Sequence, residues 1–390
     1  MIAETIPFTP SARVLRRFQG LAVVGLAALG AGFYFAPQRA WLDFLMASYA
    51  LVCLGLAGLF FVALHYATGA GWSVAIRRVP EAMTAAVPVG AVGVLTVFLA
   101  RPGIYSWYGE HFNTAEGYMG FKQTWLSHPF FVGRAVFYIA LWLIFRAVLL
   151  RTSRGQDSTG AFAATQKNTA VGTAFLVVFG LSFWLASYDW VMSLEPHWYS
   201  TIFGVYNFAG LFESGLAVMA LLVVWLRRDA LRGTASREHL QDLSTLLFAF
   251  ATFWMYIWFS QYMLIWYANL PEETLYFIKR TDGPWLALFV LTALLNWVVP
   301  FFLLLPRGNK RNPRVVAWAA VIVVLGRALD LYLMFLPPVM GANPEFHLWE
   351  AGAFLALIGV FGLTVIRGLR QAPLVPVGDP YLPESLHYHA

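Results

Sequence analysis

The sequence is short of charge. Of its 390 residues only 12% are charged and 59% are hydrophobic, and the mean hydropathy is +0.65. Soluble domains carry about a quarter charged residues, so this composition excludes an ordinary soluble protein and predicts an integral membrane protein. The net charge of +6 therefore reflects the loops between membrane spans and does not indicate nucleic-acid binding.

Cysteine and paired histidines are also scarce. Cys53 is the single cysteine, so the chain can form neither an internal disulfide nor a cysteine-ligated iron–sulfur cluster. Only His65 and His347 lie near the ends of apolar runs, and no two histidines form a pair on one helix, which disfavours haem. No glycine-rich phosphate loop is present either. We expect this chain to bind no metal, and any haem or cluster to belong to partner subunits.

Long apolar runs are what the sequence has. About 20 apolar residues cross the roughly 30 Å hydrocarbon core, and runs of this length form helices, not barrel strands. The pattern predicts an all-α integral membrane protein with about ten transmembrane helices. The runs fall at about 17–36, 40–68, 81–100, 128–150, 168–192, 200–226, 241–268, 283–305, 314–337 and 347–369.

Basic residues predict the direction of the spans. Most of the 26 lysines and arginines fall in the loops on one side, so the positive-inside rule places both termini in the cytoplasm. No convincing small-x-small cleavage site precedes Trp41, so we read the first apolar run as a span and not as a removed signal. The stretch "SLEPHWY" at 193–199 then faces outward.

Two span ends resemble each other, which suggests an internal repeat. Asp189 precedes Pro196 by seven residues, and Asp330 precedes Pro337 by the same spacing. Four spans separate the two ends, so the repeat would be parallel and would give two four-helix bundles. The predicted organisation is an N-terminus with a peripheral helix, two bundles, and a last peripheral helix with a cytoplasmic tail: 1–39, 40–199, 200–340 and 341–390.

Three ionisable residues lie deep in predicted spans, where a charge costs at least a few kcal/mol. Glu213 lies ~20 Å from the outer end of its span, near the midplane, and burial favours its neutral form. Arg327 and Asp330 are spaced i,i+3, so they share a helix face and can pair. A proton path and structural pairing are both open readings for these residues.

Further candidates lie at graded depth toward the outer side. Asp189 lies roughly 10 Å inside its span end, and Glu195 and His197 follow at the surface. Together they suit the outer mouth of a proton path, although a solvated acid at a helix stop explains Glu195 equally simply. Arg134 is expected to snorkel or to pair with an acid such as Asp189 or Glu110.

On the cytoplasmic side the candidates are His65, which ends the second span, and Asp242, which opens the seventh beside His239. Asp242 has an alternative reading as a helix-starting carboxylate that is favoured by the macrodipole.

Three long motifs carry a resemblance to a known family. They are "DWVMSLEPHWYSTIFGVYNFAG", "FSQYMLIWYANLPEET" and the tail "PLVPVGDPYLPESLHYH". From about the second span to the C-terminus the chain resembles the ActF subunits of alternative complex III, the bacterial quinol:cytochrome c oxidoreductase of respiratory or photosynthetic electron-transfer chains. These subunits, often labelled quinone-binding subunit 2, belong with the NrfD/PsrC-like membrane proteins, which have two four-helix bundles.

The resemblance implies a place in a large assembly of the bacterial inner membrane. Its partners would be an NrfD-like sister subunit, multihaem and monohaem cytochrome c subunits, an iron–sulfur subunit and small membrane subunits. The chain itself would supply a proton path and an assembly surface without a redox cofactor.

Two other functions compete with this one. In the first, the chain binds and oxidises quinol itself, with Glu213 or His197 accepting the proton. In the second it is a stand-alone secondary transporter, which the lack of obvious Gly- or Pro-broken helices at matching mid-membrane positions disfavours.

Overall fold

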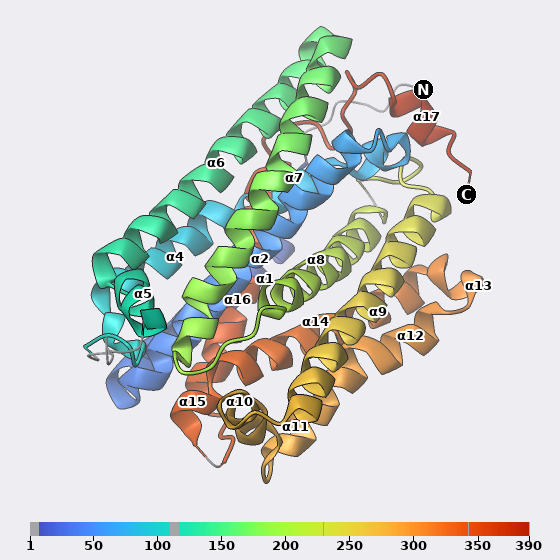
Figure 1. The fold of residues 1–390 in the computed structure, drawn as a ribbon. Helices are drawn as coiled ribbons and strands as arrows, with labels where there is room; N and C mark the ends of the chain where they lie inside the picture. Colours follow the sequence, from blue (N-terminus) through green and yellow to red (C-terminus); the bar gives the residue numbers. More distant parts are fainter. Residues whose placement is uncertain (1–7, 110–116, 229, 342, 390) are drawn as a thin grey trace.

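The computed structural model describes residues 8–109, 117–228, 230–341 and 343–389, which form helices and connecting turns. Ten helical segments are long and apolar enough to cross a membrane, which confirms the all-α membrane fold (Figure 1). They are α1 (Ala12–Phe35), α2 (Pro37–Ala67), α3 with α4 (Arg78–Met83 and Ala86–Ala100), α6 (His128–Thr159), α7 (Phe162–Trp190), α8 (Phe203–Leu226), α9 (Arg237–Ala268), α11 with α12 (Trp285–Ala293 and Val299–Leu304), α14 (Pro313–Phe335) and α16 (Leu348–Leu369).

Local sequence explains where several spans begin and end. Ser11 caps α1 by accepting a hydrogen bond from a backbone amide of the first turn, and Ser236 caps α9 in the same way. Gly160 ends α6 with φ 61°, and Asn269 ends α9 with φ 49°, so both take the left-handed conformation that terminates helices. Pro37 opens α2, where its missing N–H is not needed.

The spans pack as two groups that share α2 as a central member. α2 packs against α4 and α7, which both contact α6, while α8 packs against α9 and α14, with α12 between α9 and α14. α2 also contacts α8, α14 and α16. The helix is consequently buried along most of its length, even though a single-pass helix of its composition would face lipid. The membrane-buried polar residues gather around it.

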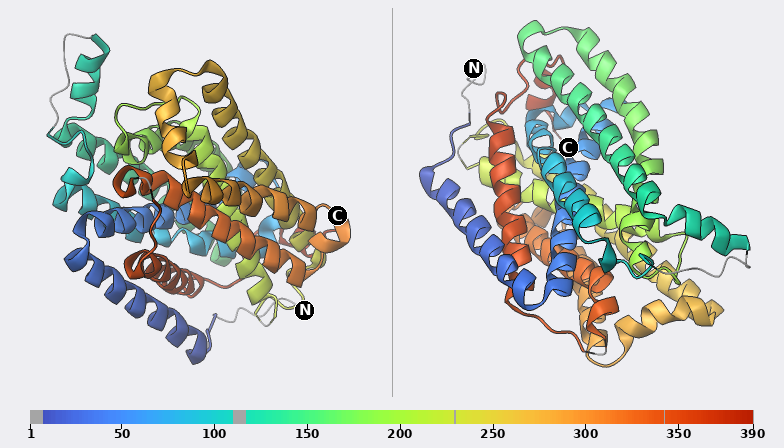
Figure 2. Two further views of the ribbon diagram at one scale, coloured as in Figure 1. Left: turned by 90° about the horizontal axis from the view of Figure 1, so that it is seen from below. Right: turned by 90° about the vertical axis from the view of Figure 1, so that its left-hand side faces the viewer.

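α1 and α16 form a peripheral pair on one side of the molecule (Figure 2). Glycine allows their close approach: a Cβ added to Gly25 would lie 2.2 Å from the backbone nitrogen of Ala356, and one added to Gly359 would lie 2.3 Å from that of Ala22. Small residues at a helix crossing are the usual way to bring two membrane helices together, because packing and not hydrophobicity drives their association.

Short helices cover both ends of the spans. We call the end with the start of α1 and the C-terminal tail the inner end, and the opposite one the outer end. At the outer end lie α5 (Gly117–Trp125), α10 (Pro271–Thr281), α15 (Pro337–Met340) and the short turns η2 (Pro102–Ile104) and η3 (Met192–Leu194). The inner end carries η1 (Gly71–Ile76), α13 (Arg307–Lys310) and α17 (Leu382–Leu386).

The eighth span contains an irregular turn that we did not predict, although Pro300 lies inside the apolar run 283–305. A π-helical turn, η4 (Leu294–Val298), separates α11 from α12, and Pro300 follows it directly. Because proline lacks an N–H, the helix cannot keep its regular hydrogen bonds at this point. The turn brings Asn296 against Gly326 of α14, where an added Cβ would lie 2.8 Å from the Asn296 side chain. Turns of this type are often found at functional sites.

Candidate functional site in the membrane interior

Arg327 and Asp330 of α14 form the centre of the site. The spacing prediction is confirmed: the Arg327 guanidinium donates to Asp330 Oδ2, and both residues are buried, with exposures of 4% and 1%. Tyr206 of α8 donates its hydroxyl to the other carboxylate oxygen. The guanidinium lies over Gly210, where an added Cβ would come within 2.4 Å of Arg327 Nη1. Glycine at this position is therefore what lets α8 and α14 close over the ion pair.

Glu213 lies beside this pair, one helical turn after Gly210 on α8. Its side chain is fully buried, at 0% exposure, and among the described residues neither carboxyl oxygen has a hydrogen-bond partner. Asp330 and Arg327 are the charged groups that act on it. Arg327 Nη2 also lacks a partner within the described chain. The structure thus brings together the three predicted mid-membrane residues, and it leaves the acid unpaired.

α2 contributes uncharged polar groups to the same region. Tyr49 donates its hydroxyl to Asn207 Oδ1 of α8 at 3.0 Å, and both residues are fully buried. Cys53, one turn further along α2, is buried as well. Three helices, α2, α8 and α14, therefore supply the interior cluster.

Asp189 lies outside this cluster and, unlike Glu213, is bound by several hydrogen-bond donors. Arg134 of α6 donates to both of its oxygens, at 2.8 and 2.9 Å, which confirms the expected pairing. Trp125 and Tyr138 donate at 2.8 and 3.2 Å, so the carboxylate accepts four hydrogen bonds. The alternative partner Glu110 lies outside the described residues. No described interaction joins Asp189 to Glu213.

Glu195 joins the two helix groups at the outer end. Its carboxylate accepts from Arg280 and Lys279 of α10, both at 2.7 Å. Arg280 is 2% exposed and also donates to the carbonyl of Leu333, at 2.8 Å, where α14 ends. Burial alone raises the pKa of Glu195, but the positive charges of Arg280 and Lys279 outweigh it and leave the pKa below its ordinary value. His197, two residues on, is exposed.

The two span ends that share the Asp-to-Pro spacing are therefore connected by Arg280, which contacts Glu195 of one and the Leu333 carbonyl of the other. Sequence reasoning did not single out this arginine. The aspartates that precede the two prolines are both arginine-paired in the structure, Asp189 with an arginine of a neighbouring helix and Asp330 with one of its own helix.

The inner candidates lie under the C-terminal tail. Asp242 accepts a hydrogen bond from Tyr388 at 2.6 Å, which raises the pKa of that tyrosine to about 12. His65 stacks on Phe61, with ring centroids 3.8 Å apart, and its Nδ1 lies 2.8 Å from the Phe61 carbonyl. Asp242 does not start its helix, because Ser236 is the N-cap and Asp242 lies in the second turn.

The tail is anchored by a buried serine. Ser385 Oγ accepts from the Ala75 amide at 3.0 Å, donates to the Trp72 carbonyl at 2.6 Å and lies 3.1 Å from His239 Nε2. A buried ion pair between Arg77 and Asp379 adds a second attachment.

One buried acid was missed from the sequence. Asp43 of α2 is 0% exposed, and neither of its oxygens has a hydrogen-bond partner in the described structure. The charged groups that act on Asp43 are Glu350 of α16 and Arg39, which pair with each other at 2.6 Å. The signal was present, since Asp43 interrupts the apolar run 40–68, but its position near the run's start reads as interfacial.

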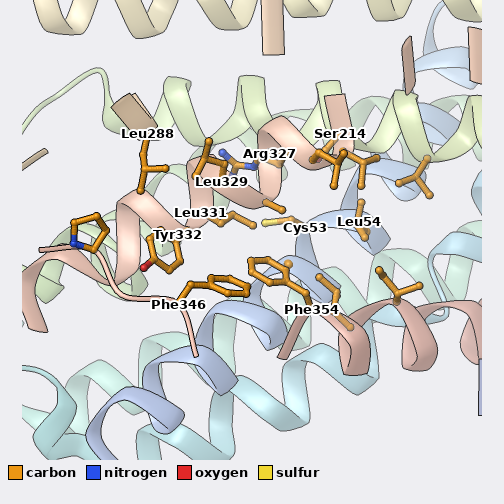
Figure 3. Close-up of a pocket in the computed structure, with 18 of the residues that line it drawn as sticks. Cys53, Leu54, Ser214, Leu288, Arg327, Leu329, Leu331, Tyr332, Phe346 and Phe354 are labelled. Atoms are coloured by element: carbon orange, nitrogen blue, oxygen red, sulfur yellow. The ribbon is translucent and has the colours of Figure 1, made fainter. Parts of the chain in front are cut away.

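A cavity of about 620 Å³ lies beside the cluster, between α2, α14 and α16 (Figure 3). Its few polar lining residues are Cys53, Ser214, Arg327, Tyr332 and Glu345, and the remaining wall is apolar, mostly leucine, valine and phenylalanine. In Figure 3 the Cys53 thiol is directed toward the space between Leu331 and Phe354.

Comparison with known proteins adds no family to this description. Neither the protein-family models nor the curated proteins contain a match to the chain. What the residues and their geometry establish is a multi-pass α-helical membrane protein with an unpaired acid next to a buried ion pair.

Proposed function

We propose that this chain is a membrane subunit of a bacterial quinol:cytochrome c oxidoreductase of the alternative complex III kind, and that it conducts protons for that complex. The three motifs of its sequence support the assignment to such an assembly. Its partners would be the sister membrane subunit, the cytochrome c and iron–sulfur subunits, and small membrane subunits. Haem and clusters would be bound by those partners.

Glu213 is the observation that carries the proton-conducting role. Burying a polar group without a hydrogen-bond partner in an apolar interior costs from about one to several kcal/mol. Hydrogen bonds normally offset this cost. Asp189 shows what a structurally paired acid looks like in this chain, with four donors around it. Glu213 has none among the described residues, so its carboxyl group is free to take up and release a proton beside the Arg327–Asp330 pair.

Asp43 and the inner cluster extend the proposed route toward the two surfaces. Asp43 follows the start of α2 by six residues, so it lies about 9 Å from the outer end of that helix. His65 and Asp242 lie at the inner end, beneath the tail. Asp189, Glu195 and His197 stay predicted members of the outer route, although the ion pairs of Asp189 and Glu195 also suit a structural role.

Oxidation of quinol by this chain itself has less support. It requires hydrogen-bonding groups directed at the quinol hydroxyls inside a pocket. The hydroxyls that line the cavity are already used: Ser214 donates to the Gly210 carbonyl at 2.7 Å, and Tyr332 to the Glu345 carbonyl at 2.7 Å.

Proton counting in the purified complex tests the proposal. In reconstituted vesicles, Glu213→Gln should leave assembly intact and lower the number of protons moved per electron, because an amide keeps the shape but cannot titrate. Ser214→Ala is the matched control, since its hydroxyl bonds only to carbonyls of its own helix. An unchanged ratio in Glu213→Gln would refute the proton role. Purification of a colourless, stable single chain without c-type haem subunits would instead refute the assignment to the complex.

A further inference from the structure

The cavity has the shape and depth of a site for a hydrocarbon chain. Its 620 Å³ volume falls within the range of roughly 300–1,000 Å³ that is typical of ligand sites. It extends along α14 from Val324 to Tyr332, about 12 Å at 1.5 Å per residue. The lining on α14 therefore runs from near the outer end of that helix toward the level of Ser214.

The rim of the cavity faces lipid. Leu325, Phe346 and Ile358 are lining residues with exposures of 56%, 63% and 48%. Two of them lie on membrane-spanning helices, so the molecules around this opening are hydrocarbon chains of the bilayer. An empty apolar cavity loses dispersion contacts over its whole wall, and water does not fill such a space.

The lining offers little to a polar ring. Ser214 and Tyr332 donate their hydroxyl protons to backbone carbonyls. The Arg327 guanidinium lies against Gly210 of α8 and pairs with Asp330 through Nη1, and only its Nη2 has no partner among the described residues. An aromatic head group with two carbonyl oxygens would bring acceptors into a wall of leucine and valine, whereas an acyl chain brings none.

The outer mouth carries a charge that selects a head group. Glu345 lines the cavity, has a side chain that is 58% exposed, and pairs with Arg39 at 2.8 Å. Arg39 also pairs with the buried Glu350. Hydrogen bonds from His347 and Arg39 lower the pKa of Glu345. Glu345 and the buried Glu350 both pair with the one guanidinium of Arg39. The excess negative charge favours a cationic group at this position.

We infer that the cavity is a binding site for one acyl chain of an amine-bearing phospholipid such as phosphatidylethanolamine. The chain lies between α14 and α16, and the ammonium group lies at Glu345. This site does not depend on the proposed proton role. It is a structural lipid site that keeps bilayer hydrocarbon, and not water, beside the Arg327–Asp330 pair.

Cys53 provides a direct reporter, because it is the only thiol of the chain and lines the cavity. Delipidated protein is reconstituted with phosphatidylethanolamine or with phosphatidylglycerol, and a lipophilic alkyl maleimide is then added. We expect phosphatidylethanolamine to slow labelling of Cys53 more than phosphatidylglycerol does, with Cys53→Ala as the zero-labelling control. Retained lipid per protein is measured by mass spectrometry on the same samples.

Two variants locate the lipid. Ala328→Phe fills the cavity and should lower retained phosphatidylethanolamine roughly tenfold, whereas Leu181→Phe, at an exposed position on α7, should leave it unchanged. Glu345→Gln should reduce the preference for phosphatidylethanolamine over phosphatidylglycerol about two- to five-fold.

Three results would overturn the inference. The first is labelling of Cys53 at the same rate with and without lipid in the wild-type protein. The second is co-purification of an isoprenoid quinone that is displaced by Ala328→Phe while phospholipid retention stays constant, which would assign the cavity to a quinone. The third is an unaltered lipid preference in Glu345→Gln, which would remove the head-group assignment. Because the wild-type labelling needs no substitution, the test holds even if a variant fails to fold.

Discussion

Substituting Asp189 by alanine should strongly destabilise the outer half of the first helix group. Arg134 is 8% exposed and Asp189 is 1% exposed, so removing the carboxylate leaves a guanidinium buried without its counter-charge. Breaking such a pair typically costs about 3–5 kcal/mol. The neutral donors Trp125 and Tyr138 contribute less, because single interhelical hydrogen bonds in bilayers average about 0.6 kcal/mol. The charge of Arg134 therefore dominates the expected loss.

A double-mutant cycle in mixed detergent micelles, with the free energy of unfolding as the readout, tests this reasoning. Asp189→Leu and Arg134→Met should, like Asp189→Ala, each be strongly destabilised, and the variant that carries both should be close to the wild type, since the apolar replacements remove both charges together. If the losses of the single variants simply add in the double variant, the structural account of the pair is wrong. If Asp189→Asn keeps its stability but moves fewer protons per electron, the residue belongs to the proton path.

Three further predictions follow from the described contacts. Because the pKa of Glu195 is lowered in the folded chain, its ion pair with Arg280 should stabilise the protein fully above the ordinary glutamate pKa, and this contribution should be lost as the pH falls through the folded-state pKa. The unfolding free energy should therefore depend less steeply on pH in Glu195→Gln than in the wild type. An identical pH dependence would contradict the stabilising role of this ion pair. Gly210→Val should displace the Arg327 guanidinium and lower both thermal stability and proton movement, whereas normal values for both would show that α8 can shift away. Ser385→Ala should cost about 1–3 kcal/mol, because a buried backbone amide of η1 loses its acceptor, and faster proteolysis of the tail is the measurement; unaltered proteolysis would mean that the ion pair of the tail suffices.

Apolar length predicted the number of spans correctly, while their ends required the structure. α6 continues to Thr159, well beyond the apolar window that ends near 150, because its polar last turns are held by buried contacts such as Arg78–Asp157. Hydropathy identifies the part of a helix that lies in lipid, but it does not predict how far the helix continues into water. The π-helical turn was not predicted either, although Pro300 inside the apolar run signals a local hydrogen-bond defect.

In the candidate site, too, contacts within one helix could be predicted from the sequence, whereas contacts between distant elements could not. The Arg327–Asp330 pair could be predicted because both residues share one helix, and i,i+3 spacing fixes their distance. The partners of Glu195 could not be, because Arg280 lies 85 residues away and its place depends on how α10 packs. Glu213 was recognised by depth alone, yet the decisive fact, its lack of a hydrogen-bond partner among the described residues, belongs to tertiary structure.

The two arginine–aspartate pairs differ in a way that bears on how the chain enters the membrane. Arg327 and Asp330 travel on one helix, so α14 can leave the translocation machinery with its charges already neutralised. Arg134 and Asp189 lie on consecutive helices, and each of them alone would carry a bare charge into the outer half of the bilayer, at a cost below the value of about 2.5–3.5 kcal/mol that applies at its centre. It follows that α6 should wait at the exit of the machinery until α7 is made, and that the two should insert as one hairpin.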